Sequence, residues 1–144
     1  MINRVLLVDD ETHVLMSLKR SLHGEPLEIV TATSAESALG IMKEHEIKVV
    51  VSDEQVAGMQ GSDFLRKVRE KYPQTQRIAL AGDVSPKVVM KAVNEGGVYR
   101  FFTKPWDTAQ IILAIRSAIE KYDLEEKNKS LLATIKYSTM ERWG

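Results

Sequence analysis

The stretch VVVSDEQVAGMQG, residues 49–61, decides how the rest of the chain is interpreted. Its three leading valines are poor helix formers and good strand formers, so the segment predicts a buried strand that ends at Ser52 or Asp53. A loop with two glycines follows. In open α/β sheets ligands bind at the carboxyl ends of the strands, where the loops are free of strand packing. Asp53 is therefore a candidate site residue, provided that other segments converge on it.

Strand-like and helix-like segments alternate along the whole chain. In the segments between the strands, and after the last one, apolar side chains recur every three or four residues, which predicts helices. This alternation indicates a doubly wound parallel sheet with helices on both faces. We expect an α/β, flavodoxin-like (βα)5 fold with strand order 2-1-3-4-5 and an extended C-terminal helix. The expected strands cover residues 3–8, 27–32, 49–53, 76–81 and 100–103.

Short polar residues and a glycine mark several helix ends. Ser34, Asp107 and Ser85, which precedes a proline, are expected N-caps. The fourth helix is expected to end at residues 94–97, where a glycine can take the left-handed conformation.

Composition limits the class of protein. The chain has 144 residues, one domain's worth, with 20 acidic and 20 basic residues and no cysteine. Because the charges balance, the chain has no net electrostatic field that would attract nucleic acid or a membrane surface. The absence of cysteine excludes disulfides and thiolate chemistry. No segment is typical of a signal peptide or a membrane span, so we expect a cytoplasmic protein with no direct nucleic-acid or membrane partner.

Charged residues follow several of the expected strands. Asp9 and Asp10 follow the first strand, Asp53 follows the third and Lys104 follows the fifth. Parallel strands end on one edge, and in the order 2-1-3-4-5 strands one and three are neighbours. Three carboxylates therefore share a crevice, which is unfavourable unless a cation neutralises them. Oxygen ligands with room for water favour Mg²⁺, and a carboxylate beside Mg²⁺ and a lysine is suited to forming an aspartyl phosphate.

These residues resemble a known family. The Asp9-Asp10 pair, Asp53 and the FFTKPW segment together resemble the receiver domain of two-component response regulators, over residues 2 to about 122. The resemblance implies a receiver domain at 1–122, followed by an extension or linker at 123–144. It makes Asp53 the phosphoacceptor and Lys104 its catalytic partner.

The resemblance also implies further roles. Asp10 would bind Mg²⁺ directly, Asp9 mainly through water, and Asp53 and the backbone carbonyl of Gln55 would complete the metal ligands. Phe101 lies at the position of the family's switch aromatic, and the bond before Pro105 is expected to be cis.

Two positions depart from the family pattern. Ala81 stands where the family normally has Thr or Ser to bond the phosphoryl oxygen, a loss of about 1.5–3 kcal/mol when the partner is charged. The coupling of phosphorylation to the switch aromatic Phe101 is therefore expected to weaken. Ala57, where a proline is frequent, changes only a turn. Gln55 and Asp83 are candidates for setting the lifetime of the phosphoryl group.

The leading function is a receiver that takes a phosphoryl group from a sensor histidine kinase or phosphotransfer protein and so switches protein interactions. The alternative is a pseudo-receiver that keeps the fold and switches poorly because of Ala81. Enzyme classes fit less well. A haloacid-dehalogenase-like phosphatase needs an aspartate two residues after its nucleophile, and position 55 is Gln. A flavodoxin-like electron carrier must bind the phosphate of its flavin after the first strand, where the acidic residues at 9–11 would repel it. We expect no enzyme activity beyond self-catalysed phosphotransfer and dephosphorylation.

The helical pattern continues through the extension. Leu124, Leu131 and Ile135 would be exposed on a projecting helix, which predicts a homodimer or a linker to an effector. The YRFFTKPW segment resembles receivers attached to cyclic di-GMP phosphodiesterases of the HD-GYP type, and those of some hybrid kinases. No residue indicates which output this chain serves.

Overall fold

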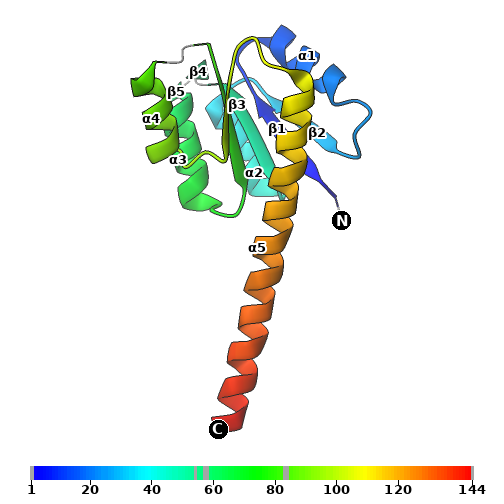
Figure 1. Ribbon diagram of the computed structural model, residues 1–144, viewed down its shortest axis with the longest axis vertical. Helices are drawn as coiled ribbons and strands as arrows, with labels where there is room; N and C mark the ends of the chain where they lie inside the picture. Colours follow the sequence, from blue (N-terminus) through cyan, green and yellow to red (C-terminus); the bar gives the residue numbers. More distant parts are fainter. Residues whose placement is uncertain (1, 54, 57–58, 83–84, 144) are drawn as a thin grey trace.

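The computed structural model describes residues 2–53, 55–56, 59–82 and 85–143, with backbone only at 55–56, 59–62 and 137–143. The five strands of the main sheet alternate with helices as predicted (Figure 1). The strands are β1 (Arg4–Val8), β2 (Glu28–Ala32), β3 (Val49–Asp53), β4 (Gln55–Val56), β5 (Met59–Gln60), β6 (Gln76–Ala81) and β7 (Arg100–Thr103). The helices are α1 (Thr12–Ser21), α2 (Ala35–Glu44), α3 (Gly61–Lys71), α4 (Pro86–Asn94) and α5 (Thr108–Trp143).

The main sheet has the predicted topology. Its order is β2-β1-β3-β6-β7, and every neighbouring pair is parallel. Counting only these five strands, the order is 2-1-3-4-5, which confirms the flavodoxin-like fold. The strand bounds agree with the predicted ones to within one residue at each end.

A two-stranded ribbon was not predicted. β4 and β5 pair antiparallel, with Gln55 opposite Gln60 and Val56 opposite Met59. Two-residue strands carry no alternating pattern, so periodicity cannot reveal them. The ribbon leads directly into α3.

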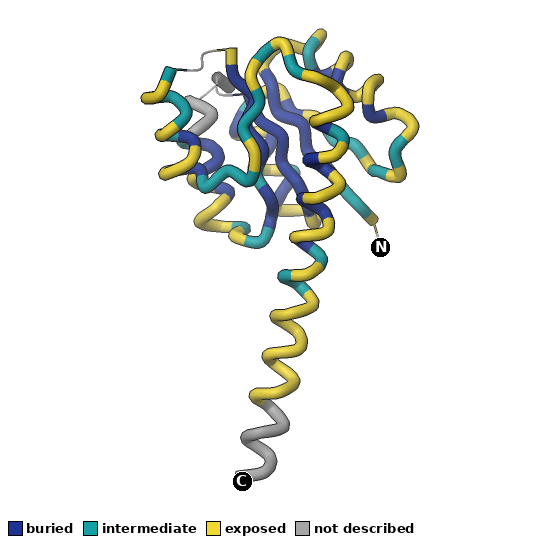
Figure 2. The backbone as a smooth tube through the Cα atoms, viewed as in Figure 1, coloured by how far each residue is buried: buried dark blue, intermediate teal, exposed yellow. Residues whose placement is uncertain are grey.

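The sheet is buried on both faces by separate cores. Alternate strand residues point to opposite faces, so Leu7 joins the core with α1 and α5, whereas Leu6 joins the core with α2 and α3. Figure 2 shows this buried centre under an exposed outer surface. A strand buried on both faces needs a continuous apolar run, which explains the valines at the start of β3.

The expected helix caps are present. The Ser34 hydroxyl accepts a hydrogen bond from the Ser37 N–H at 3.1 Å, and the Ser85 hydroxyl accepts one from the Val88 N–H at 3.4 Å. Asp107 Oδ1 accepts from the Ala109 N–H at 2.9 Å. Gly97 has a φ of 57°, so it is the glycine of segment 94–97 that takes the predicted left-handed conformation.

Helix α5 extends far beyond the sheet. It has 36 residues, and its first turns pack through Ile111, Ile115 and Ala118. The helix then leaves the domain as a single rod, and residues 127–136 are exposed (Figures 1 and 2). Among the helices of the described residues, none combines the length and apolar character that a membrane crossing requires.

Candidate functional site: a carboxylate cluster at the strand ends

Four charged side chains meet at the carboxyl edge of the sheet. One carboxylate oxygen from each of Asp9, Asp10 and Asp53 lies within 4.8 Å of the others. The Lys104 ammonium lies 3.2 Å from Asp53 Oδ1 and 3.9 Å from Asp9 Oδ2. The structure therefore brings together the three aspartates and the lysine that the sequence pointed to, although they come from three different strands.

Strand register explains this convergence. Val8 at the end of β1 pairs with Ser52 near the end of β3, so the residues that follow them lie side by side. On the other side of β3, the Lys104 N–H donates a hydrogen bond to the Ala81 carbonyl at 2.8 Å. This bond continues the pairing of β6 with β7 by one residue and sets the direction in which the Lys104 side chain leaves the backbone.

Burial makes the Asp9 carboxylate costly to ionise. It is 1% exposed, and burial raises the pKa of its carboxyl from 3.8 to about 6. A hydrogen bond from the Glu11 N–H to Asp9 Oδ1, at 2.9 Å, opposes this rise in pKa. The nearby charge of Asp53 raises the pKa further, while Lys104 lowers it. The carboxylate is therefore costly to ionise unless more positive charge is supplied.

The cluster fits a small hard cation. Asp9 Oδ2 is buried and accepts no hydrogen bond, which leaves an oxygen available as a ligand. Asp53 is 7% exposed and Asp10 is exposed, so one side of the cluster opens to water. Carboxylate oxygens together with water are the ligand set that Mg²⁺ prefers.

The other predicted site residues lie on β4, β6 and β7 and in the turn after β7, as far as the structure describes them. Ala81 ends β6, is fully buried and presents a methyl group. Phe101 is half-buried and packs on the core formed by α2 and α3. The backbone of Gln55 begins β4, two residues after Asp53, and the peptide bond between Lys104 and Pro105 is cis. Ala57 and Asp83 lie outside the described residues.

Two backbone contacts were not foreseen. The Glu11 N–H bonds Asp9, as described above, and the Ser52 hydroxyl donates to the Asp53 carbonyl at 2.9 Å. The first has a sequence signal, since an aspartate commonly accepts from the N–H two residues later at a turn. The second has none, because a serine inside a valine-rich strand is equally consistent with simple packing.

Comparison with known proteins bears directly on this site. The family model described as the response regulator receiver domain matches residues 5–116. Among curated proteins, the hydrogenase transcriptional regulatory protein HoxA of Cupriavidus necator is 33% identical over 94% of this chain and 28% of its own length. The sensor kinase CckA of Brucella abortus is 31% identical over 83% of this chain and 13% of its own length. The chain thus spans less than a third of these curated relatives.

Solved structures of receiver domains are also similar to this chain. The signal receiver domain of an HD domain-containing protein from Pseudomonas fluorescens is 35% identical, with a TM-score of 0.84. The alignment covers 88% of this chain and 93% of that one. A response regulator receiver domain from Clostridium thermocellum is 29% identical, with a TM-score of 0.78 over 85% and 98% of the two chains.

Proposed function

Because this chain belongs to the response regulator receiver domain family, we propose that Asp53 accepts a phosphoryl group from a sensor histidine kinase or a phosphotransfer protein and so controls protein interactions. The observation that carries this proposal is the 3.2 Å ion pair between Lys104 and Asp53 beside two further carboxylates. Receiver domains in general are signalling modules rather than enzymes, and this chain is proposed to catalyse only its own phosphorylation and dephosphorylation.

In the proposed reaction an Asp53 carboxylate oxygen attacks phosphorus. The bond between phosphorus and the donor's imidazole nitrogen breaks as the new phosphorus–oxygen bond forms, and the leaving imidazole takes up a proton. Lys104 holds its ammonium where negative charge gathers on the phosphoryl oxygens. Mg²⁺, held by Asp10, Asp53, the Gln55 carbonyl and, through water, Asp9, would neutralise the same charge.

A small-molecule phosphodonor tests the proposal without the cognate kinase. Treatment with such a donor and Mg²⁺ should add one phosphoryl mass to the wild-type protein and none to Asp53→Asn. A matched control is Asp63→Asn, since Asp63 lies on α3 outside the cluster. Equal incorporation in the wild-type protein and Asp53→Asn would refute Asp53 as the acceptor.

A pseudo-receiver is the second candidate, and Ala81 favours it. Because Ala81 is fully buried and lacks a hydroxyl, it cannot bond a phosphoryl oxygen and draw its loop inward. Beryllofluoride with Mg²⁺ separates the two candidates by amide NMR. Shifts that spread from Asp53 to Phe101 support a switching receiver, whereas shifts confined to the cluster support the pseudo-receiver.

We further propose that residues 1–122 form the receiver and that residues 123–144 join it to a second copy or to an effector. Exposed leucines support an association, since Leu124, Leu131 and Leu132 are 59%, 55% and 65% exposed along the projecting helix. An isolated helix is marginal in water unless its apolar side chains find a partner. Sedimentation at micromolar concentration tests the dimer, and a purely monomeric profile would contradict it.

A further inference from the structure

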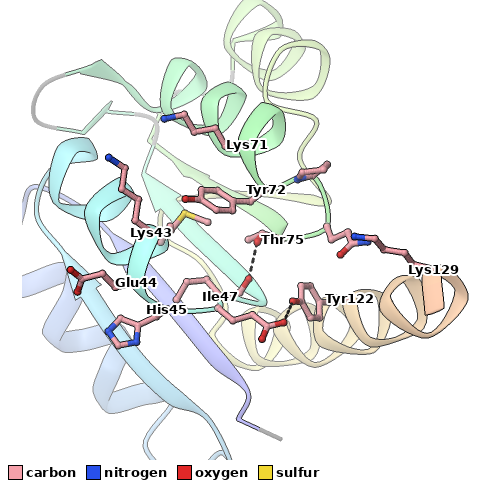
Figure 3. A pocket seen from close by; sticks show the side chains of 13 residues that line it. Lys43, Glu44, His45, Ile47, Lys71, Tyr72, Thr75, Tyr122 and Lys129 are labelled. Atoms are coloured by element: carbon pink, nitrogen blue, oxygen red, sulfur yellow. Dashed lines mark hydrogen bonds between the residues drawn. The ribbon is translucent and has the colours of Figure 1, made fainter. Parts of the chain in front are cut away.

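One turn of α5 is tied to the amino-terminal edge of the sheet, the edge opposite the carboxylate cluster. The Tyr122 hydroxyl donates a hydrogen bond to the Glu46 carboxylate, drawn in Figure 3 at the rim of a surface cavity. Lys48 Nζ lies 2.7 Å from Asp123 Oδ1. These contacts join a helix to residues that precede it by more than seventy positions.

A third contact extends the set. Gln76 Nε2 donates to Glu125 Oε2 at 3.4 Å. Lys48 directly precedes β3, which ends at Asp53, and Gln76 begins β6, which ends at Ala81. The helix is therefore attached near the start of β3, whose far end carries Asp53, and near the start of β6, whose last residue Ala81 accepts the hydrogen bond from the Lys104 N–H.

Lys48 is the central residue of this set. Its side chain is 5% exposed, and its ammonium also donates to Asn3 Oδ1 at 2.9 Å and lies 5.7 Å from the centre of the Tyr122 ring. A buried ammonium is tolerated only when hydrogen bonds and an opposite charge surround it. Asp123 supplies that charge, so losing the Asp123 carboxylate while the helix stays in place would leave the Lys48 ammonium buried without the opposite charge beside it.

Open space flanks this turn of the helix, beside the buried side chain of Tyr122. A cavity of about 450 Å³ lies on one side, between Tyr122, Lys129 and the loops at Ile47 and Thr75 (Figure 3). Another cavity, of about 580 Å³, is lined by Ile2 and by α5 residues from Tyr122 to Ser130. Burial raises the pKa of Tyr122 above its usual range, and its bond to Glu46 raises it further, so the hydroxyl stays protonated and keeps donating.

We propose that these residues form a polar clamp that fixes the direction in which α5 leaves the domain. The clamp consists of Glu46, Lys48 and Gln76 on the sheet edge and Tyr122, Asp123 and Glu125 on the helix. A partner or chain segment that binds the projecting part of α5 is then held at a set orientation to β3 and β6. The clamp does not depend on phosphorylation, so an experiment that refutes the clamp leaves the proposed function untouched, and the reverse also holds.

Distance measurements between spin labels test the clamp. The chain has no cysteine, so Lys67→Cys on α3 and Lys136→Cys on the projecting helix carry the only labels. Labelled protein is diluted into unlabelled protein so that distances within one chain dominate. With the clamp intact, we expect one narrow distance distribution. In Asp123→Asn, and in Lys48→Met, we expect that narrow peak to be lost.

Two further variants make the result decisive. Lys48→Met combined with Asp123→Met removes both charges, so no buried ammonium is stranded and folding is preserved, yet the distribution should still broaden. Lys127→Met, an exposed change on the same helix, should leave it narrow. Narrow distributions that superimpose on the wild type in both Asp123→Asn and the double variant would overturn the proposal.

Discussion

Replacing Asp9 by asparagine should stabilise the metal-free protein. A rise of the Asp9 pKa from 3.8 to about 6 means that the folded state binds this proton more tightly than the unfolded chain does. The stability gained from that proton is complete below pH 3.8 and is lost as the pH rises through 6. The loss amounts to at most about 3 kcal/mol, since each pKa unit corresponds to about 1.4 kcal/mol.

Asparagine keeps the shape of the side chain and removes the charge. It retains an oxygen for the Glu11 N–H, so the turn after β1 is preserved. Urea unfolding in EDTA should therefore show Asp9→Asn to be more stable than the wild type at pH 8, by up to about 3 kcal/mol, with the difference vanishing near pH 4. Asp10→Asn, the same change at an exposed neighbour, should have a much smaller effect.

In saturating Mg²⁺ the wild type should become more stable than Asp9→Asn. A cation that binds only the folded state stabilises it by RT ln(1 + [Mg²⁺]/Kd), and Asp9→Asn gives that cation a weaker site. If Asp9→Asn is no more stable than the wild type at pH 8 in EDTA, the buried carboxylate is not the source of strain and the electrostatic reasoning fails.

Three further outcomes are expected. Gly97→Ala should lower the free energy of unfolding by about 1–2 kcal/mol in urea, because φ is +57° and the new Cβ would lie 3.0 Å from the Arg69 side chain; unchanged stability would contradict the left-handed turn. Ala81→Thr should cost about 1–3 kcal/mol at a fully buried position but enlarge the NMR response to beryllofluoride with Mg²⁺, and an unchanged response would show that the hydroxyl is not what limits switching. Leu131→Glu should shift sedimentation towards the monomer, Lys129→Glu should not, and equal profiles would place the interface elsewhere.

Much of this fold can be predicted from the sequence because the same strand pattern recurs along it. A branched apolar run that stops at a charged residue, as at Val51 and Asp53, marks both a buried strand and its carboxyl end. Given the five strands, parallel topology and the order 2-1-3-4-5 together place Asp9, Asp10 and Lys104 near Asp53. The site was predictable because it depends on strand ends, which periodicity marks well.

The polar clamp could not be predicted, because no sequence pattern marks the residues that form it. Lys48 precedes three valines, and nothing in that pattern distinguishes a buried ammonium from an exposed one at the start of a strand. Its partner Asp123 lies in a charged run that is typical of a solvated helix face. Only the path of α5 across the sheet edge pairs them. The β4–β5 ribbon was missed because each strand is too short to show a period.

The central claim is that residue 53 is phosphorylated in a magnesium-dependent manner, and borohydride trapping tests it most directly. Borohydride reduces an aspartyl phosphate to homoserine, which peptide mass spectrometry locates within the chain. After phosphodonor treatment with Mg²⁺, we predict homoserine at position 53 and unmodified Asp9 and Asp10, with no homoserine when EDTA replaces the metal. Homoserine at another carboxylate, or equal trapping at position 53 in EDTA, would contradict the account.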